Sequence, residues 1–482
     1  MNFSPPLDQQ AESATDSAEI LRIFEAQRET ALRWRTSTAQ ERILRICRLH
    51  DAVLEQRVRI QQAGFRDFRK PPEEVDLAEL MPVVSEAREA MRSLRKWMQP
   101  KHVMPSRMML GTSSWIKPEP KGRCLIISPW NYPLNLTLGP LISCLAAGNT
   151  AIIKPSEMTP HLSAVMAEII RDVFQENEVA LLQGQAALAG TLLELPFDHI
   201  FFTGSPAIGK LVMAAAARHL SSVTLELGGK SPTIVDADAD VRLAARSTIW
   251  GKFSNNGQTC IAPDHVYVHA TIKEEFSREC ALALTASYGA TAAQQLHSPA
   301  LARVVNTRHA ERIAALLQDA TRRGARVVFG GEVRVEDCFV QPTLLDSVPS
   351  DAKIMQEEIF GPVLPIIAFD DLEQVIGLIN AQPKPLALYI WGRNKQRINQ
   401  LLDNTSAGGS CINDCLVQYA HGGLPFGGVN NSGIGSAHGW YGFRAFSHER
   451  SVVRTRVHLV RMFFPPYGRV TRRILNFVLR IL

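Results

Sequence analysis

The sequence lacks the cysteine and histidine patterns that bind metal ions or form paired thiols. Its eight cysteines include no CxxC pair and no Cys/His spacing typical of a metal site. We therefore expect free thiols in a reducing, cytoplasmic environment and no bound metal. We expect no secretory signal either, because residues 1–10 contain neither a basic region nor an apolar region.

The chain also lacks a long apolar run and a dominant charge. No uninterrupted apolar run reaches about 18 residues, so no membrane-spanning helix is expected. The net charge is +5 at pH 7, with 52 Lys and Arg against 47 Asp and Glu, which implies no nucleic-acid partner. With 46% hydrophobic and 21% charged residues, the composition is typical of a soluble globular protein. A length of 482 residues is enough for two or three packed domains.

Helical and strand-like patterns occupy different parts of the chain. Residues 17–62 have the spacing of one or two amphipathic helices, and residues 73–98 predict another helix, kinked at Pro82. From residue 122 onward, short apolar runs alternate with helical segments, which predicts two α/β domains built on parallel sheets, with a cleft between them. We expect strands at residues 124–128, 150–154, 199–203, 222–226, 233–235, 266–268, 326–329 and 364–367.

Cys260 and Glu226 are the residues whose surroundings most clearly indicate chemistry. Cys260 follows a Gly257-Gln258-Thr259 turn, and Glu226 precedes Gly228-Gly229. A thiolate nucleophile with a separate carboxylate base allows covalent capture of a carbonyl, followed by its release by water. The residues alone also fit an inert buried thiol and a surface carboxylate at the end of a strand.

Six segments resemble the aldehyde dehydrogenase family in their order and spacing, over roughly residues 20–450. They are Pro129-Trp130-Asn131-Tyr132-Pro133, Lys154-Pro155-Ser156-Glu157, Phe202-Thr203-Gly204-Ser205, Leu225-Glu226-Leu227-Gly228-Gly229-Lys230, Gly257-Gln258-Thr259-Cys260 and Glu357-Glu358-Ile359-Phe360-Gly361-Pro362. Three further segments are similar to the class 3 branch, which acts on fatty, aromatic and coniferyl-type aldehydes. These are Ile261-Ala262-Pro263-Asp264, Ser432-Gly433-Ile434-Gly435 and Phe446-Ser447-His448.

The resemblance implies oxidation of an aldehyde to a carboxylate through a thiohemiacetal and a thioester on a cysteine. Cys260 matches the nucleophile and Glu226 matches the base that activates water. Asn131 matches the amide that stabilises the oxyanion together with the Cys260 N–H, and loss of one such donor costs about 3 kcal/mol. Asn131 also suits a turn before Pro133, and both roles are compatible.

The resemblance further implies a nicotinamide cofactor. Gly204 to Gly209 lack the G-x-G-x-x-G fingerprint, and a glycine turn before a helix is weak evidence for phosphate binding by itself. The residues that match the family's cofactor positions are Trp130, Lys154, Glu157, Gly204, Ser205, Gly209, Glu358 and Phe360. Because the Glu157 carboxylate should repel a 2′-phosphate, we expect NAD as the cofactor, with NADP as the alternative.

The implied fold is α/β, with a Rossmann-like NAD-binding domain, an α/β catalytic domain and a β-strand oligomerisation arm. The expected boundaries are 1–104 and 119–227 for the NAD-binding domain, 228–428 for the catalytic domain, 105–118 and 429–455 for the arm, and 456–482 for a tail. The arm implies a homodimer. Two other functions are compatible with parts of the pattern: a cofactor-independent thiol esterase or acyltransferase, and a non-catalytic scaffold. The presence of Cys260, Glu226 and Asn131 together argues against the scaffold.

The glycine-rich segment 422–442 predicts loops rather than regular structure. His421 precedes it and could handle a proton. Because no partner for His421 can be named, we leave it out of the catalytic set.

The tail predicts an amphipathic helix. Arg469, Arg472, Arg473, Asn476 and Arg480 form one stripe, and apolar residues cover the remaining face. A basic helix of this kind suits peripheral contact with a membrane interface. Packing on its own subunit or on a dimer mate, over the substrate entrance, is the alternative.

Overall fold

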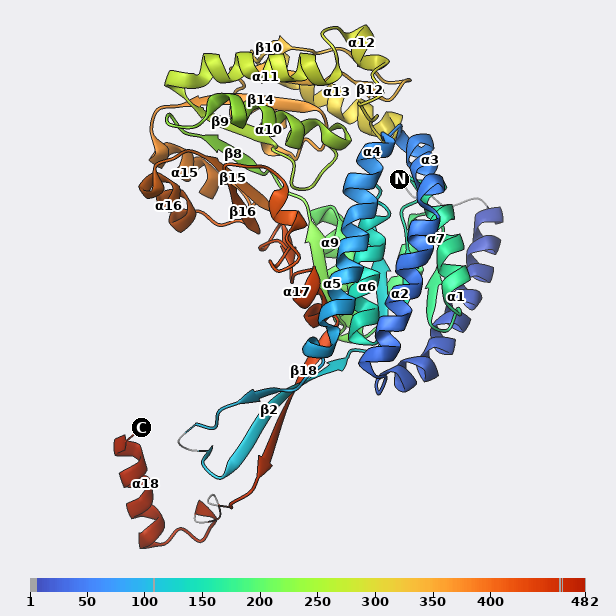
Figure 1. Cartoon of the computed structure of the whole chain (residues 1–482), viewed down its shortest axis with the longest axis vertical. Coiled ribbons are helices and arrows are strands. Elements are labelled where there is room, and N and C mark those ends of the chain that lie inside the picture. Colours follow the sequence, from blue (N-terminus) through green and yellow to red (C-terminus); the bar gives the residue numbers. More distant parts are fainter. Residues whose placement is uncertain (1–6, 107–108, 459–460, 462, 482) are drawn as a thin grey trace.

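The computed structural model describes residues 7–106, 109–458, 461 and 463–481, with side chains described between residues 17 and 480 (Figure 1). Two α/β bodies lie side by side, and a β-ribbon projects away from them. The predicted α/β fold class is confirmed.

The N-terminal region forms three helices where the sequence pattern predicted one or two. A capping box separates the first two helices, because Thr38 N–H donates to Glu41 Oε2 (2.6 Å) and Glu41 N–H donates to Thr38 Oγ1 (3.3 Å). Pro82 lies in the first turn of α5, directly after a π-helical turn, where its missing N–H is tolerated. The elements are α1 (Leu7–Trp34), α2 (Ala39–Glu55), α3 (Arg57–Phe68), α4 (Pro72–Val75), η1 (Asp76–Leu80) and α5 (Met81–Trp97).

The first body contains a six-stranded sheet, parallel except for the pairing of β17 with β7. Its strands, in spatial order, are β17 (Gly433–Ile434), β7 (Ser222–Leu227), β6 (His199–Gly204), β3 (Arg123–Ile127), β4 (Thr150–Lys154) and β5 (Val179–Leu181). The helices that pack on it besides those named are α6 (Asn135–Ala147), α7 (Pro160–Val173), α8 (Ala186–Leu193) and α9 (Pro206–His219).

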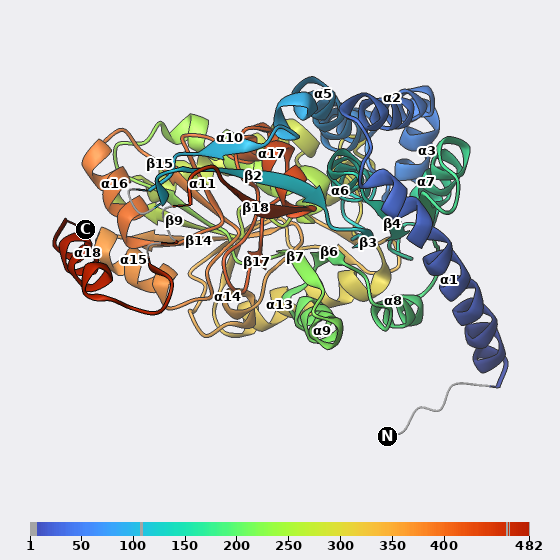
Figure 2. The same ribbon diagram turned by 90° about the horizontal axis from the view of Figure 1, so that it is seen from below.

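Alternate residues of these strands enter two different cores, as the pleat of a strand requires. Cys124 and Ile126 pack with α2, α5, α6 and α7 on one face, whereas Leu125 and Ile127 pack with α1, α8 and α9 on the other. Figure 2 shows these helices on the two sides of the sheet. A parallel sheet buried on both faces explains why its strands are continuous apolar runs in the sequence.

The second body contains a seven-stranded sheet, parallel except for the pairing of β10 with β13. Its strands, in spatial order, are β10 (Arg326–Phe329), β13 (Thr343–Asp346), β14 (Val363–Phe369), β9 (His265–His269), β8 (Pro232–Val235), β15 (Ala387–Trp391) and β16 (Gly409–Ile412). The surrounding elements are α10 (Val241–Phe253), α11 (Lys273–Tyr288), α12 (Ala292–Leu296), α13 (Thr307–Arg322), β11 (Val333–Arg334), β12 (Phe339–Val340), α14 (Lys353–Gln356), α15 (Leu372–Asn380) and α16 (Lys395–Asn404).

The projecting ribbon pairs β2 (Thr112–Pro120) with β18 (Ser447–Thr455) in antiparallel register, and β1 (Lys101–Val103) joins β2. Only part of the segment 429–455, which we expected in the arm, lies there. Its β17 pairs with β7, and its helix α17 (Gly439–Ala445) packs into the core of the first body. The arm boundaries therefore differ from the expected ones.

The tail helix α18 (Arg469–Ile481) lies beyond the outer end of the arm, away from both bodies (Figure 1). Apolar side chains of this helix are exposed to solvent, including Val470 (70%), Phe477 (64%) and Leu479 (71%). Among the described residues, α18 therefore packs on neither of the two α/β bodies. Among the helices that the structure describes, none has the length and apolar character needed to cross a membrane.

Candidate active site

Cys260 lies in a tight loop between α10 and β9. Asn255, Asn256 and Gly257 all have left-handed backbone conformations, with φ of 50°, 54° and 74°. A Cβ on Gly257 would lie 2.3 Å from the Gly361 carbonyl oxygen, so only glycine fits there. The loop therefore turns sharply against the segment that follows Phe360 and leaves Cys260 at the edge of a cavity.

Glu226 lies near the end of β7 and lines the same cavity as Cys260. Its side chain is buried, and both carboxylate oxygens are without a hydrogen-bond partner among the described residues. This burial raises the pKa of Glu226 well above its usual range. A buried carboxyl group without a partner, lining the same cavity as a thiol, can exchange a proton with a molecule in the cavity.

The cavity is narrow, with about 30 Å³ open to molecules of the size of water, and mostly apolar in its walls. His438, Phe426 and Tyr419 form an aromatic part of the wall. The His438 and Phe426 rings stack at 5.1 Å, and the Tyr419 ring meets the edge of His438 at 4.6 Å. Burial lowers the pKa of His438 to about 4, so its ring is neutral at pH 7. His421, by contrast, is exposed and accepts a hydrogen bond from Gly423 N–H (3.2 Å).

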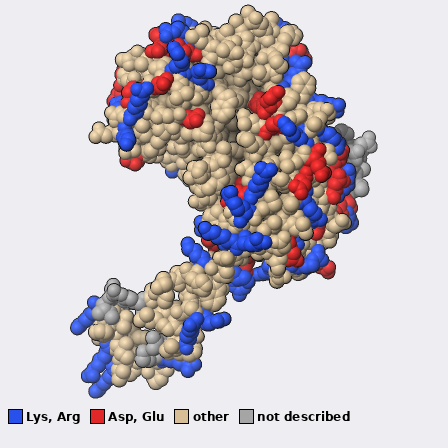
Figure 3. Space-filling view, in the orientation of Figure 1, with Lys and Arg blue, Asp and Glu red and all other residues tan. Residues whose placement is uncertain are grey.

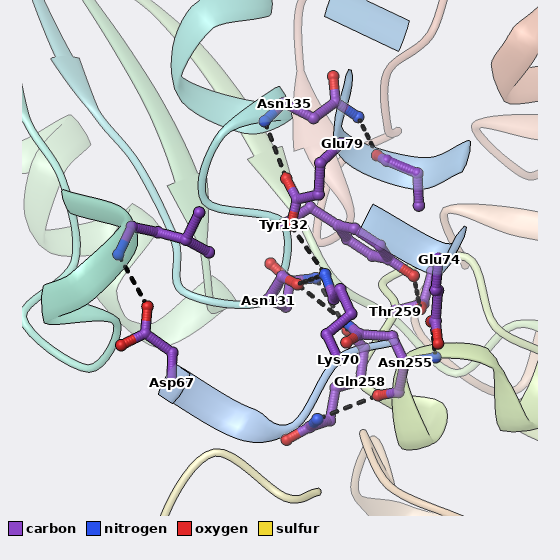
Figure 4. A network of polar contacts seen from close by, with 12 residues as sticks. Asp67, Lys70, Glu74, Glu79, Asn131, Tyr132, Asn135, Asn255, Gln258 and Thr259 are labelled. Carbon is purple, nitrogen blue, oxygen red and sulfur yellow. Dashed lines mark hydrogen bonds and ion pairs between the residues drawn. The ribbon is translucent and has the colours of Figure 1, made fainter. Parts of the chain in front are cut away.

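Asn131 is held directly against the Cys260 loop (Figure 4). It is 3% exposed, and its Nδ2 donates to the Gln258 carbonyl (3.0 Å). The adjacent Tyr132 hydroxyl lies 2.6 Å from Thr259 Oγ1. Two successive residues before α6 thus contact the two residues that precede Cys260. The amide nitrogen of Asn131 carries a second N–H, which can serve as a donor to another group.

The Cys260 thiol is protonated at neutral pH in the structure as it stands. Its pKa is raised to about 12, first by burial and then by the Glu358 and Glu226 carboxyl groups. A positive charge placed near the sulfur would favour the thiolate. The oxidised nicotinamide ring carries such a charge.

The predicted cofactor residues of the first body lie at the carboxyl ends of its parallel strands. Lys154 ends β4, and its Nζ pairs with Glu157 Oε2 at 2.6 Å. Gly204 ends β6, and Ser205 is the N-cap of α9. A Cβ on Gly209 would lie 2.7 Å from the Leu227 side chain, so this glycine allows α9 to pack closely on β7. This edge of a doubly wound sheet is where dinucleotides bind.

The remaining cofactor residues are Glu358 and Phe360 of the second body and Trp130, which follows β3 in the first. Glu358 packs against the backbone at Gly228, where a Cβ would lie 2.2 Å from its Oε2 atom. The Trp130 and Phe360 rings meet edge to face at 5.3 Å. Burial raises the pKa of Glu358 to about 8. The structure therefore brings the predicted cofactor residues to the two sides of the junction between the bodies, which fits a dinucleotide.

Several buried charged residues at the site were not singled out from the sequence. Lys230 pairs with Asp264, and Asp264 Oδ1 accepts from Ile359 N–H at 2.8 Å, which holds the segment carrying Glu358. Lys70, Glu74 and Glu79 of the N-terminal helical region belong to the polar network around Asn131 and Asn255 (Figure 4). Their sequence signal is weak, because charged residues beside Pro71-Pro72 look like those of an exposed turn.

The chain is similar to known proteins over most of its length. Residues 9–452 match the model of the aldehyde dehydrogenase family. The chain is 41% identical over 421 residues to the 4,4'-diaponeurosporen-aldehyde dehydrogenase of Staphylococcus aureus, covering 87% of this chain and 90% of that protein. It is 39% identical over 451 residues to aldehyde dehydrogenase family 3 member B1 of Bos taurus, covering 93% and 95%. The solved structure of Staphylococcus aureus AldH in a substrate-bound state superposes with a TM-score of 0.90 at 38% identity, covering 95% and 99%.

Proposed function

The chain belongs to the aldehyde dehydrogenase family and is an NAD(P)-dependent oxidoreductase, and from this premise we propose that Cys260, Glu226 and Asn131 carry out the oxidation. The observation that supports these roles is the shared cavity: a buried, unpaired carboxyl group and a thiol line the same apolar space. Aldehyde dehydrogenase activity needs one nucleophile and one base in that relationship.

In the first half-reaction, the Cys260 thiol loses its proton to solvent, because a nearby positive charge such as that of a bound oxidised nicotinamide ring would favour the thiolate. The sulfur then attacks the aldehyde carbon and forms a C–S bond. The carbonyl electron pair moves to oxygen, and the resulting oxyanion is stabilised by the Asn131 Nδ2–H and the Cys260 N–H. A bound nicotinamide cofactor, which Lys154, Glu157 and Glu358 would hold, would supply the acceptor for the hydride that leaves this carbon. The oxyanion electrons then restore the C=O bond, and a thioester remains on Cys260.

In the second half-reaction, Glu226 in its ionised form takes a proton from a water molecule. The water oxygen attacks the thioester carbon, and the same donors stabilise the second oxyanion. When the C–S bond breaks, the sulfur leaves with the bonding electron pair and the carboxylic acid departs. The buried position of Glu226 suits this task, because a raised pKa makes a carboxylate a stronger base.

We propose NAD as the preferred cofactor. The support is Glu157, whose carboxylate is held by Lys154 at the end of β4, where a ribose of a bound dinucleotide would lie. A second carboxylate-bearing position, Glu358, packs on Gly228 and would contact the other ribose. A 2′-phosphate beside Glu157 would place two negative groups together, which disfavours NADP.

We propose medium- or long-chain aliphatic or aromatic aldehydes, including coniferyl-type ones, as substrates. The support is the apolar wall around Cys260, with Leu136, Phe426 and Leu386 among its residues. A charged or strongly hydrated aldehyde would lose its hydration in this cavity without compensating hydrogen bonds, so its binding is disfavoured. A relative at 41% identity is named for 4,4'-diaponeurosporen-aldehyde.

An aldehyde series tests this function. The protein is incubated with aliphatic aldehydes of increasing length, with cinnamyl-type aldehydes, and with NAD or NADP, and the absorbance of the reduced cofactor is recorded. We expect kcat/KM to increase with apolar size. Ester hydrolysis without any cofactor-dependent signal would instead support the thiol esterase, and no reaction in either assay would support the scaffold.

We also propose that the arm joins two copies of the chain and that α18 contacts an anionic membrane surface. From residue 450 to the end, the sequence has eight arginines and no Asp or Glu. On the face shown in Figure 3, Lys and Arg side chains mark the outer end of the arm. Exposed apolar side chains on α18 together with this unbalanced positive charge are the features of an interfacial helix.

A further inference from the structure

Lys70 is a fully buried ammonium group at the end of the helical region that precedes Pro71. Its exposed fraction is 0%, and its Nζ donates to Glu79 Oε1 (2.7 Å) and to the Asn131 carbonyl oxygen (3.0 Å). The rings of Tyr132 and Phe68 lie 4.3 Å and 4.8 Å from Nζ. Two oxygen acceptors and two aromatic rings, all suited to a cation, therefore surround this ammonium group.

Glu79, the carboxylate that pairs with Lys70, is itself held in place. Its side chain is also 0% exposed, and its Oε2 accepts from Asn135 N–H (3.0 Å) in the first turn of α6. The Leu134 N–H also donates to this carboxylate. An anion at a helix N-terminus is stabilised by the unpaired N–H groups there, so the pair is tied to the helix that follows Asn131.

Asn131 is thus anchored at its backbone as well as at its side chain. Its carbonyl oxygen accepts from Lys70 Nζ and from Asn255 Nδ2 (2.8 Å), while its own Nδ2 donates to Gln258. On the opposite side of the loop, Glu74 accepts a hydrogen bond from Asn255 N–H. This network joins the N-terminal helical region to Asn131 and to Asn255, the residue at the start of the Cys260 loop.

We propose that Lys70, held by Glu79, is a positioning residue that fixes the Asn131 amide as an oxyanion donor. The inference rests on the proposed role of Asn131. An oxyanion donor acts only when its N–H lies about 2.7–3.1 Å from the developing charge, and a displacement of about 1 Å can lower a rate about a hundredfold. Lys70 touches no reacting atom, so it acts through the backbone of Asn131.

The test is the single-turnover rate of cofactor reduction in Lys70→Met, divided by the number of reactive Cys260 thiols counted by alkylation. We expect this rate per thiol to fall at least about tenfold, while the Kd for the cofactor changes less than about twofold. We also expect Asn131→Ala to lower the rate much less in the Lys70→Met background than in the wild type, because the donor is already misplaced. A rate per thiol within about twofold of wild type, or full additivity with Asn131→Ala, would overturn the proposal.

Lys273→Met is the matched control, because it breaks the Lys273–Asp346 pair between α11 and β13. It should lower thermal stability without changing the rate per thiol. If Lys70→Met does not fold, Glu74→Leu and Glu74→Gln test the network from the Asn255 side. Only the glutamine keeps an acceptor for Asn255 N–H, so only Glu74→Leu should lower the rate per thiol, and equal rates would overturn the network. A wild-type protein that reduces no cofactor with any aldehyde would refute the proposed function instead.

Discussion

Cys260 and Glu226 line one cavity although they belong to different bodies of the protein. Glu226 lies near the end of β7 in the six-stranded sheet, whereas Cys260 lies in the loop before β9 of the seven-stranded sheet. Neither body alone contains both groups. The proposed chemistry therefore depends on the packing between the two bodies, and on the loops that cross between them.

The first prediction concerns Glu226→Gln. Glutamine has nearly the same shape but cannot accept a proton from water, so the thioester should form and then persist. We expect one burst of reduced cofactor per active site, followed by steady turnover about 10²- to 10⁴-fold slower than in the wild type. Rapid-mixing absorbance measures the burst. As a control, Cys260→Ala should show no burst. If Glu226→Gln turns over repeatedly at the wild-type rate, Glu226 is not the base.

The second prediction concerns the pH dependence of Cys260. Its raised pKa, about 12, means that the thiolate fraction, and with it the rate of alkylation by iodoacetamide, should increase about tenfold per pH unit through the neutral range. Because the Glu358 carboxylate contributes to this increase in the pKa, Glu358→Gln should lower it and accelerate alkylation at pH 8 roughly threefold or more. Peptide mass spectrometry identifies the site. Cys47, whose pKa is raised by burial and by Asp51, is the internal control. A plateau near pH 7 would contradict the prediction.

Strand positions were readable from the sequence because most strands of both sheets are buried on both faces. The strand predicted at 150–154 is β4 (Thr150–Lys154), and the one predicted at 266–268 lies in β9 (His265–His269). The number of N-terminal helices was not readable, because apolar spacing continues across the capping box at Thr38. The arm boundaries also differ, since the short pairing of β17 with β7 leaves no periodic pattern.

The residues of the site also differ in how clearly the local sequence marks them. The segments around Cys260 and Glu226 are distinctive in the local sequence. Lys70 is not, because its partner Asn131 lies 61 residues away and only the fold brings them together. His438 was also missed, since a histidine in a glycine-rich loop gives no sign that its ring will be buried against Phe426.

The third prediction concerns Gly228→Ala. The added Cβ would lie 2.2 Å from Glu358 Oε2, so the carboxylate or the backbone must move. We expect the KM for the cofactor to increase about tenfold, because the proposed ribose contact is displaced. Gly190→Ala is the matched control, since a Cβ there meets nothing within 4 Å. Equal cofactor KM values for the two variants would argue against a role of Glu358 in cofactor binding.

The fourth prediction concerns cofactor choice. Glu157→Ser removes the carboxylate that we propose repels a 2′-phosphate and frees Lys154 from its pair. The ratio of kcat/KM for NADP to that for NAD should increase about tenfold, which corresponds to about 1.4 kcal/mol. Initial rates with both cofactors and one aldehyde give this ratio. Glu176→Ser, which removes an exposed carboxylate paired with Arg22, should leave the ratio unchanged.

The fifth prediction concerns the tail. Deletion of residues 465–482 removes α18 with its exposed apolar face and its arginines, so binding to vesicles containing anionic lipid should be lost. Each arginine near such a surface contributes about 1 kcal/mol, and added salt should weaken binding of the full chain. Vesicle co-sedimentation measures both effects.

Two controls separate a membrane contact from packing on a second copy of the chain. A variant with Arg469, Arg472, Arg473 and Arg480 changed to Gln keeps the apolar face, so it should lose the preference for anionic over neutral vesicles. If α18 instead covers a dimer mate, the deletion should change the sedimentation coefficient of the protein and leave vesicle binding as it was. Activity with a short aldehyde, measured for each variant, verifies that the two bodies still fold. Unchanged partitioning of the deletion variant would exclude a membrane contact through α18.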